Sequence, residues 1–276
     1  MSDDRDSAVL CLTFDNMGMA RAVGAGEASR PDEDEPGLRV GYPRVLDLLD
    51  ELGIKATFFI EAWNCLHHAD RVQEIARRGH EIGMHGFVHE KFGALPKLRV
   101  EQVLYDSFAA FESLGVHPIG FRAPGGVRGP FAIEPLVELG IRFDSSLPDE
   151  SGSVEQRAEM GGADTPPDRT PQPHALAPGL VTFPFEWRLV DAYLYRSDGG
   201  TRTPEDLVED WSDELHACAR SRNLMTVIFH PYVSGTRDDR YDGMRRFLEL
   251  ASNDPSVRIS TMGEQAMAFR SAGSVS

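Results

Sequence analysis

The sequence predicts an α/β protein, a distorted TIM-like (β/α) barrel of about seven strands in a single domain. Short apolar segments rich in β-branched and aromatic residues alternate along the chain with amphipathic segments of helical spacing. Such alternation favours a parallel sheet with helices outside it. At 276 residues the chain can bury one large core, so we expect one domain over residues 1–276.

The first half of the chain alternates strands and helices. Ala8–Phe14 is an apolar run typical of a buried strand, and Lys55–Ile60 is strand-like through its β-branched and aromatic residues. Tyr42–Leu52 has helical apolar spacing, with Pro43 in its first turn and Gly53 after its end. The same periodicities give, in order, helix Ala69–Arg78, strand His80–Met84, helix Val100–Leu114 and strand His117–Phe121.

The second half continues the alternation after two expected loop insertions. Residues 17–40 are Gly-rich and acidic, and residues 151–178 are rich in Gly, Pro and Ala without any period, so both are predicted to be loops. The other predicted elements are helix Phe131–Leu139, strand Ile141–Phe143, helix Glu205–Ser221, strand Leu224–Phe229, helix Tyr241–Ala251, strand Val257–Ile259 and helix Met262–Arg270.

Composition excludes several classes of partner. The formal charge of −16 disfavours binding to nucleic acid or to anionic membranes, because both require a concentrated basic surface. Three widely spaced cysteines indicate reduced thiols, and no segment has the length and apolarity of a membrane span. The acidic N-terminus lacks the features of a secretion signal, so we expect a cytoplasmic protein. The sequence leaves a homo-oligomer open.

Polar residues follow the ends of successive predicted strands. Because the carboxyl ends of parallel strands meet at one edge of a sheet, we expect these side chains to gather there. They are Asp15, Asn16, Glu61, His85, His89, Arg122, Asp144 and His230.

His85 and His89 have the spacing of a metal-binding pair. Residues i and i+4 share one face of a helical turn, and imidazole suits zinc, iron, cobalt or nickel. Asp15 at a strand end can act as a general base or as a ligand. The alternatives are that the histidines are structural or surface residues, and that Asp15 and Asn16 only cap a turn.

Two further strand ends carry groups suited to amide chemistry. Arg122 can hold a carboxylate such as Asp15 by a bidentate contact. His230 can protonate a departing amine, since the ordinary pKa of histidine is near 6.5. The alternatives are a solvated arginine in a Pro-Gly-Gly turn and a hydrogen-bonded core histidine.

Four motifs in order resemble the polysaccharide deacetylase family, the NodB-homology group of carbohydrate esterase family 4. They are TFDN (Thr13–Asn16), HGFVH (His85–His89), RAPGG (Arg122–Gly126) and FHP (Phe229–Pro231). The resemblance spans about residues 8 to 270 and implies a distorted (β/α) barrel that removes N-acyl groups with a divalent metal and water. Further segments look like a leader-less branch that includes allantoinase-like and cyclic-imide-hydrolase-like proteins.

The resemblance also implies roles for single residues. Asp15 corresponds to the catalytic base, Arg122 to the residue that holds it, and His230 to the general acid. His85 and His89 correspond to metal ligands, and the third ligand position is Asn16, where the family has a carboxylate. An amide oxygen is a poorer ligand, so either Asp15 becomes the ligand, or metal binding is weak, or the chemistry proceeds without metal.

We therefore expect a hydrolase of a non-peptide C–N bond, acting on a small-molecule substrate by N-deacetylation or deformylation with a divalent metal, zinc in the first place. Glu61, Trp63 and Trp187 are expected to contact the substrate. One alternative is a metal-free amidohydrolase of a cyclic imide or ureide. The other is a non-catalytic deacetylase-like protein in a biosynthetic pathway.

Overall fold

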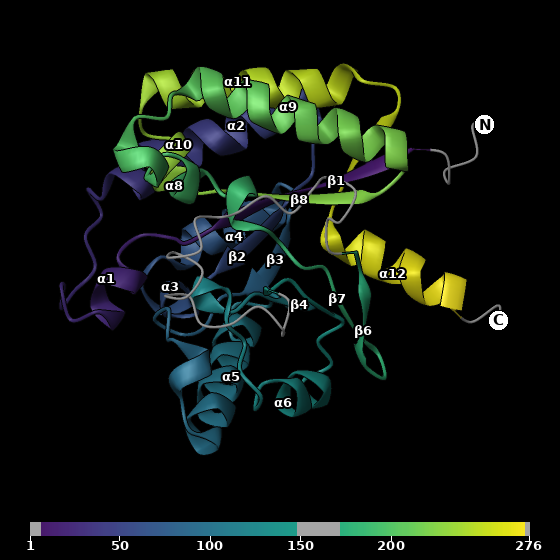
Figure 1. Ribbon diagram of the computed structural model, residues 1–276. Coiled ribbons are helices and arrows are strands. Elements are labelled where there is room, and N and C mark those ends of the chain that lie inside the picture. The colour runs from purple at the N-terminus through teal and green to yellow at the C-terminus, as the bar shows by residue number, and fades with distance from the viewer. Residues whose placement is uncertain (1–6, 148–171, 274–276) are drawn as a thin grey trace.

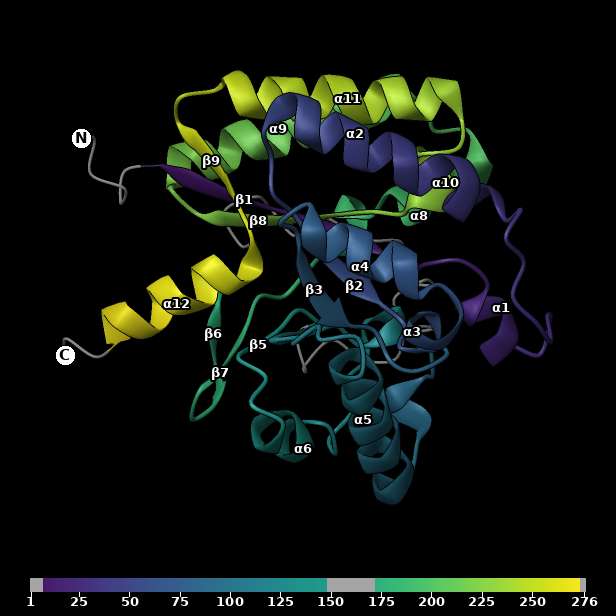
Figure 2. The ribbon, with the colours of Figure 1, turned by 180° about the vertical axis from the view of Figure 1, so that it is seen from behind.

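The computed structural model describes residues 7–147 and 172–273, which form one sheet with helices on both sides (Figures 1 and 2). The strand order is β6-β7-β5-β4-β3-β2-β1-β8, and β9 also pairs with β1. The strands are β1 Ala8–Asp15, β2 Thr57–Ile60, β3 Glu81–Met84, β4 Gly120–Phe121, β5 Phe143–Asp144, β6 His174–Ala177, β7 Leu180–Thr182, β8 Leu224–Phe229 and β9 Val257–Ser260. Every ladder is parallel except that between β6 and β7.

The distorted barrel is open. In the described ranges β6 and β8 stand at opposite ends of the strand order and share no ladder, so the sheet curls without closing. The apolar run of β1 is explained by its central place: it pairs with β2, β8 and β9, and seven of its eight residues are buried. A strand covered on both faces needs apolar residues throughout rather than in alternation.

The longer helices form two groups around the sheet. Helices α2, α9 and α11 lie beside β1 and β8, whereas α4, α5 and α6 lie toward β2 to β5 (Figures 1 and 2). These helices and the C-terminal one are α2 Tyr42–Leu52, α4 Ala69–Arg77, α5 Lys97–Glu112, α6 Ile133–Glu138, α9 Pro204–Ser221, α11 Asp238–Asn253 and α12 Met262–Gly273.

Short helical turns occupy several connections near the carboxyl edge. They are α1 Ala20–Gly24, η1 Gly37–Gly41, α3 Trp63–His67, η2 Phe92–Ala94, η3 Pro124–Gly126, η5 Trp187–Leu189, α8 Asp191–Leu194, η6 Ser197–Gly200 and α10 Pro231–Ser234. The expected loop over residues 17–40 is therefore wrong in part, since α1 and most of η1 lie within it. Among the described residues, no helix is long and apolar enough to cross a membrane.

The strand count of about seven was too low, because nine strands are present in the described ranges. The added pair, β6 and β7, forms a hairpin around Gly179, whose φ of 84° favours glycine. His174–Ala177 had been expected to be loop, and it is a partly exposed edge strand held by its ladder to β7 rather than by burial. Most of the predicted 151–178 insertion lies outside the described residues. The cysteines are free thiols, as expected.

Candidate active site

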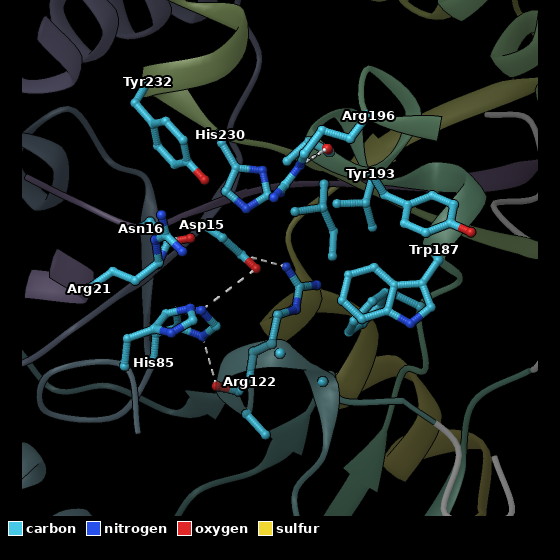
Figure 3. Close-up of a pocket in the computed structure, with 18 residues that line it drawn as sticks. Asp15, Asn16, Arg21, His85, Arg122, Trp187, Tyr193, Arg196, His230 and Tyr232 are labelled. Atoms are coloured by element: carbon cyan, nitrogen blue, oxygen red, sulfur yellow. Dashed lines mark hydrogen bonds and ion pairs between the residues drawn. The ribbon is translucent and has the colours of Figure 1, made fainter. Parts of the chain in front are cut away.

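The polar strand ends meet at the carboxyl edge of the sheet, where they surround a cavity of about 660 Å³ (Figure 3). Asp15 ends β1, His85 follows β3, Arg122 follows β4, and His230 follows β8. Seven of the nine predicted site residues line the cavity: Asp15, Asn16, His85, His89, Arg122, Trp187 and His230.

Arg122 holds Asp15 in a fixed orientation. Its Nη1 lies 2.6 Å from Asp15 Oδ1 and 2.8 Å from Thr13 Oγ1. Its Nε and Nη2 donate to the carbonyl and the hydroxyl of Ser145, and its guanidinium lies 4.2 Å from the centre of the Phe59 ring. The side chain is 1% exposed, so this buried charge is compensated by Asp15 and by hydrogen bonds. The second oxygen of Asp15 is left facing the histidines.

His230 is held by Asp191, a residue that the sequence analysis missed. Asp191 Oδ1 lies 2.6 Å from His230 Nδ1, and Asp191 Oδ2 accepts from the His230 backbone N–H and from Ser234 Oγ. Because the carboxylate accepts at Nδ1, the other ring nitrogen of His230 is available to the cavity that it lines. The sequence pointed to Asp191 only through its place in the apolar segment LVDAYL. An acid in such a segment is expected to be buried, and a buried carboxylate needs a hydrogen-bonding or charged partner.

His85 is prepared to act as a metal ligand. Its Nδ1 lies 2.9 Å from the carbonyl of Arg122, and since a carbonyl only accepts, Nδ1 must carry the proton. The bare Nε2 then lies 4.0 Å from Asp15 Oδ2. Burial lowers the pKa of both His85 and His89 to about 3, so both rings are neutral near pH 7. Their centroids are 5.1 Å apart.

The structure places a carboxylate beside Asn16. Asn16 Nδ2 donates to Glu61 Oε1, while the Met17 backbone N–H and Asn64 Nδ2 donate to Oε2. Parallel pairing of β1 with β2 brings the two strand ends together, since Asp15 is in register with Phe59. Asn16 thus supports the Glu61 carboxylate.

Glu61, His85 and His89 form the group that could hold a metal ion, with ligand atoms within 4.8 Å of one another. A carboxylate offers about four lone-pair positions, and three donors leave one of them for a cation. Burial raises the pKa of Glu61 to about 7, so a nearby cation would favour its ionised form. These residues fit a divalent metal. The sequence offered Asn16 or Asp15 as the third ligand, whereas the candidate group in the described residues has Glu61 in that place.

Two backbone conformations at the site are unusual. Asn16 has a φ of 66° and His89 a φ of 69°, in the left-handed region, which Asn adopts more readily than other non-glycine residues and His adopts seldom. Such conformations cost about 1–3 kcal/mol and persist where the surroundings enforce them. At His89 this geometry turns the ring toward His85, as their ring contact shows.

The two predicted aromatic contacts fall in different places. Trp187 lines the cavity with Tyr193, whose ring centre is 5.7 Å from its own. Trp63 does not line the cavity: it is 7% exposed and lies 4.1 Å from the ring of His67 on the same helix, so it belongs to the core under α3. Glu61, which we expected to contact the substrate, is likewise outside the cavity lining. It belongs instead to the group that could hold a metal ion.

Comparison with known proteins identifies the family. The sequence pattern of polysaccharide deacetylases matches residues 2–143, which is just over half of the chain and includes Asp15, His85, His89 and Arg122. The chain belongs to the polysaccharide deacetylase family. As a member of this family it is a hydrolase of amide carbon–nitrogen bonds.

Relatives of this deacetylase support the assignment over the full chain. The peptidoglycan deacetylase of Helicobacter pylori is 26% identical over 264 residues, which are 88% of this chain and 89% of the relative. A crystal structure assigned to the polysaccharide deacetylases of Mycobacterium smegmatis superposes with a TM-score of 0.80 at 27% identity, covering 99% of this chain and 93% of its own. The PuuE allantoinase structure, at 18% identity and a TM-score of 0.77 over 97% and 92% of the two chains, shares the fold.

Proposed function

We propose that this deacetylase removes the acyl group from the nitrogen of a small N-acylated molecule, with a divalent cation, zinc in the first place, at Glu61, His85 and His89. The supporting observation is that an Arg-held carboxylate, Asp15, and an Asp-held imidazole, His230, line one cavity beside that ligand group. Two imidazoles and a carboxylate are a common zinc set. A cavity of about 660 Å³ is of the size that takes a small molecule.

The protein groups divide the proton transfers between them. Asp15 accepts the proton of the attacking water through the oxygen that Arg122 leaves unbound. His230 donates a proton to the departing nitrogen, and Asp191 stabilises the imidazolium that this role requires. When bound, the metal would supply polarisation of the carbonyl oxygen and activation of water. The overall reaction is transfer of the acyl group from nitrogen to water, which gives a carboxylic acid and an amine.

Hydrolysis of small N-acetyl and N-formyl amines tests the proposal. We expect the zinc-loaded protein to hydrolyse these amides, to lose activity when zinc is chelated, and to recover it when zinc is returned. The amine that is released measures the reaction. No turnover of any amide would contradict the proposed function. Turnover of hydantoin or allantoin that survives chelation would replace it by ring opening of a cyclic imide or ureide. The cytoplasmic location stays a prediction.

Replacing Asp191 by Asn is expected to lower kcat by at least about a hundredfold with little change in KM. The amide would present an N–H to the His230 ring and favour the wrong tautomer, as the same change does in serine-protease triads. The pH profile of kcat should lose its acid-assisted limb, which a purely structural role would leave in place. Asp47→Asn, the same change on the exposed face of α2, is the control. A hundredfold loss shared by both variants would contradict this role for Asp191.

A further inference from the structure

Two arginines in the cavity lining have no acidic partner among the residues that the structure describes. Of the charged side chains in the lining, Asp15 and Arg122 pair with each other at 2.6 Å. The remaining two, Arg21 and Arg196, are exposed and make no ion pair with a described residue. Arg122 thus has its acid within the lining, whereas Arg21 and Arg196 have no acidic partner among the described residues.

Arg196 is oriented by its own backbone. Its Nε donates to the carbonyl of Ala192, one turn earlier, at 2.7 Å. Figure 3 shows this side chain beside Tyr193, with its guanidinium toward His230. The contact at Nε leaves both terminal nitrogens for another acceptor, and a fixed guanidinium fork is the arrangement that binds a carboxylate or phosphate in bidentate fashion.

Arg21 enters the same cavity from the opposite side, on the short helix α1 and beside Asn16 (Figure 3). Tyr232 lines the same cavity as the two arginines. Burial and the negative charges of Asp191 and Glu61 raise the pKa of Tyr232 to about 12, while Arg21 and Arg196 act in the opposite direction.

Ion pairing with acids is common, though not universal, among the arginines outside the cavity lining. The chain has a formal charge of −16, so carboxylates are plentiful partners for its cations. Among the described residues outside the cavity lining, ten arginines form ion pairs with carboxylates: Arg39, Arg44, Arg71, Arg78, Arg128, Arg188, Arg202, Arg237, Arg245 and Arg246. Two cations without an acidic partner at a reaction cavity can attract an anionic group.

We infer that the substrate carries an anionic group, a carboxylate or a phosphate, on the part remote from its acyl nitrogen, and that Arg21 and Arg196 bind this group. That the bound anion is part of a substrate rests on the proposed function. Anion binding itself can be measured without turnover. Trp187, Tyr193 and Tyr232 flank the two arginines in the lining and would contact the carbon skeleton that connects the anion to the amide.

Calorimetric titration of the full chain tests anion binding directly. The probes are glutarate, glycerol 3-phosphate and glutaramide, the uncharged diamide of glutarate. We expect the two anions to bind, the tighter one identifying the group, and the diamide not to bind. Arg21→Gln and Arg196→Gln should each weaken anion binding by about tenfold, the range of one charge-assisted contact, and added salt should weaken it further.

Arg77→Gln is the matched control, because Arg77 is an exposed arginine on α4 outside the cavity and its loss changes the net charge equally. Its anion binding should equal that of the unchanged protein. Glutarate and glycerol 3-phosphate binding that survives both cavity substitutions, or that falls equally in Arg77→Gln, would overturn the inference.

Turnover separates the inference from the proposed function. N-acetyl-β-alanine and its amide differ only in the charge of the remote group. We expect kcat/KM to be about tenfold higher for the acid, with the advantage lost in Arg196→Gln mainly through KM. Equal hydrolysis of the two compounds contradicts the inference and leaves the proposed function standing. Hydrolysis of neither contradicts the proposed function, while the titration still decides whether the anion site exists.

Discussion

Replacing Asp15 by Asn is expected to lower kcat for amide hydrolysis by about 10²–10⁴-fold, the usual contribution of a positioned general base. The change keeps an acceptor for Arg122 at Oδ1 and removes the basic oxygen that faces His85. Because Asp15 is not in the ligand group, zinc bound per chain should be unchanged. Steady-state kinetics and metal analysis of the same sample measure both effects.

The fold of this variant needs its own check, because Arg122 would keep a buried charge without its carboxylate. We expect a loss of about 3–5 kcal/mol in the free energy of unfolding, measured by thermal denaturation. Asp15→Glu keeps the charge but displaces the carboxylate, and it should also be nearly inactive. Asp47→Asn should be fully active. More than a tenth of normal kcat in folded Asp15→Asn would contradict the assignment of the base.

The residues at the carboxyl ends of the strands could be predicted from the sequence, because the ends of strands and helices depend on local sequence patterns. Tyr42–Leu52 begins and ends as predicted, and β1 is longer than its prediction by Asp15 alone. An apolar run in the sequence ends directly before Asp15, His85 and His230. Their positions at strand ends could therefore be predicted from the sequence. A parallel sheet then brings these ends together whatever its detailed register.

The partners of these residues could not be predicted in this way. Glu61 reaches Asn16 because β1 and β2 pair with Asp15 opposite Phe59, and a register between strands 45 residues apart leaves no trace in either segment. Asp191 reaches His230 across 39 residues because the preceding residue, Val190, pairs with Ile228 of β8. Sequence motifs therefore indicated the groups that react and one group that holds them, Arg122, whereas Asp191 and the Glu61–Asn16 contact required the fold.

Replacing Glu61 by Gln is expected to reduce zinc affinity by about a hundredfold or more, since it removes the single carboxylate of the ligand group. The activity should fall with it and return only partly at high zinc concentration. Metal titration against a competing chelator measures the affinity. Glu81→Gln is the matched control: burial also raises the pKa of Glu81 to about 7, yet its oxygens accept from Thr57 and Gly263 near α12. Glu81→Gln should lose stability and keep its metal.

Exchanging the two side chains distinguishes a ligand from a group that is merely buried nearby. Asn16→Asp alone removes the N–H group that donates a hydrogen bond to Glu61 and places two carboxylates side by side. One of them should then take up a proton, and the free energy of unfolding of the metal-free protein should fall by about 1–3 kcal/mol. In Asn16→Asp with Glu61→Gln, the carboxylate moves to position 16 and the donor to position 61. Zinc affinity should then return to within about tenfold of the unchanged protein, although each part of the exchange is harmful alone. If the double variant binds zinc no better than Glu61→Gln, position 16 does not reach the metal, and the carboxylate must come from position 61, directly after β2.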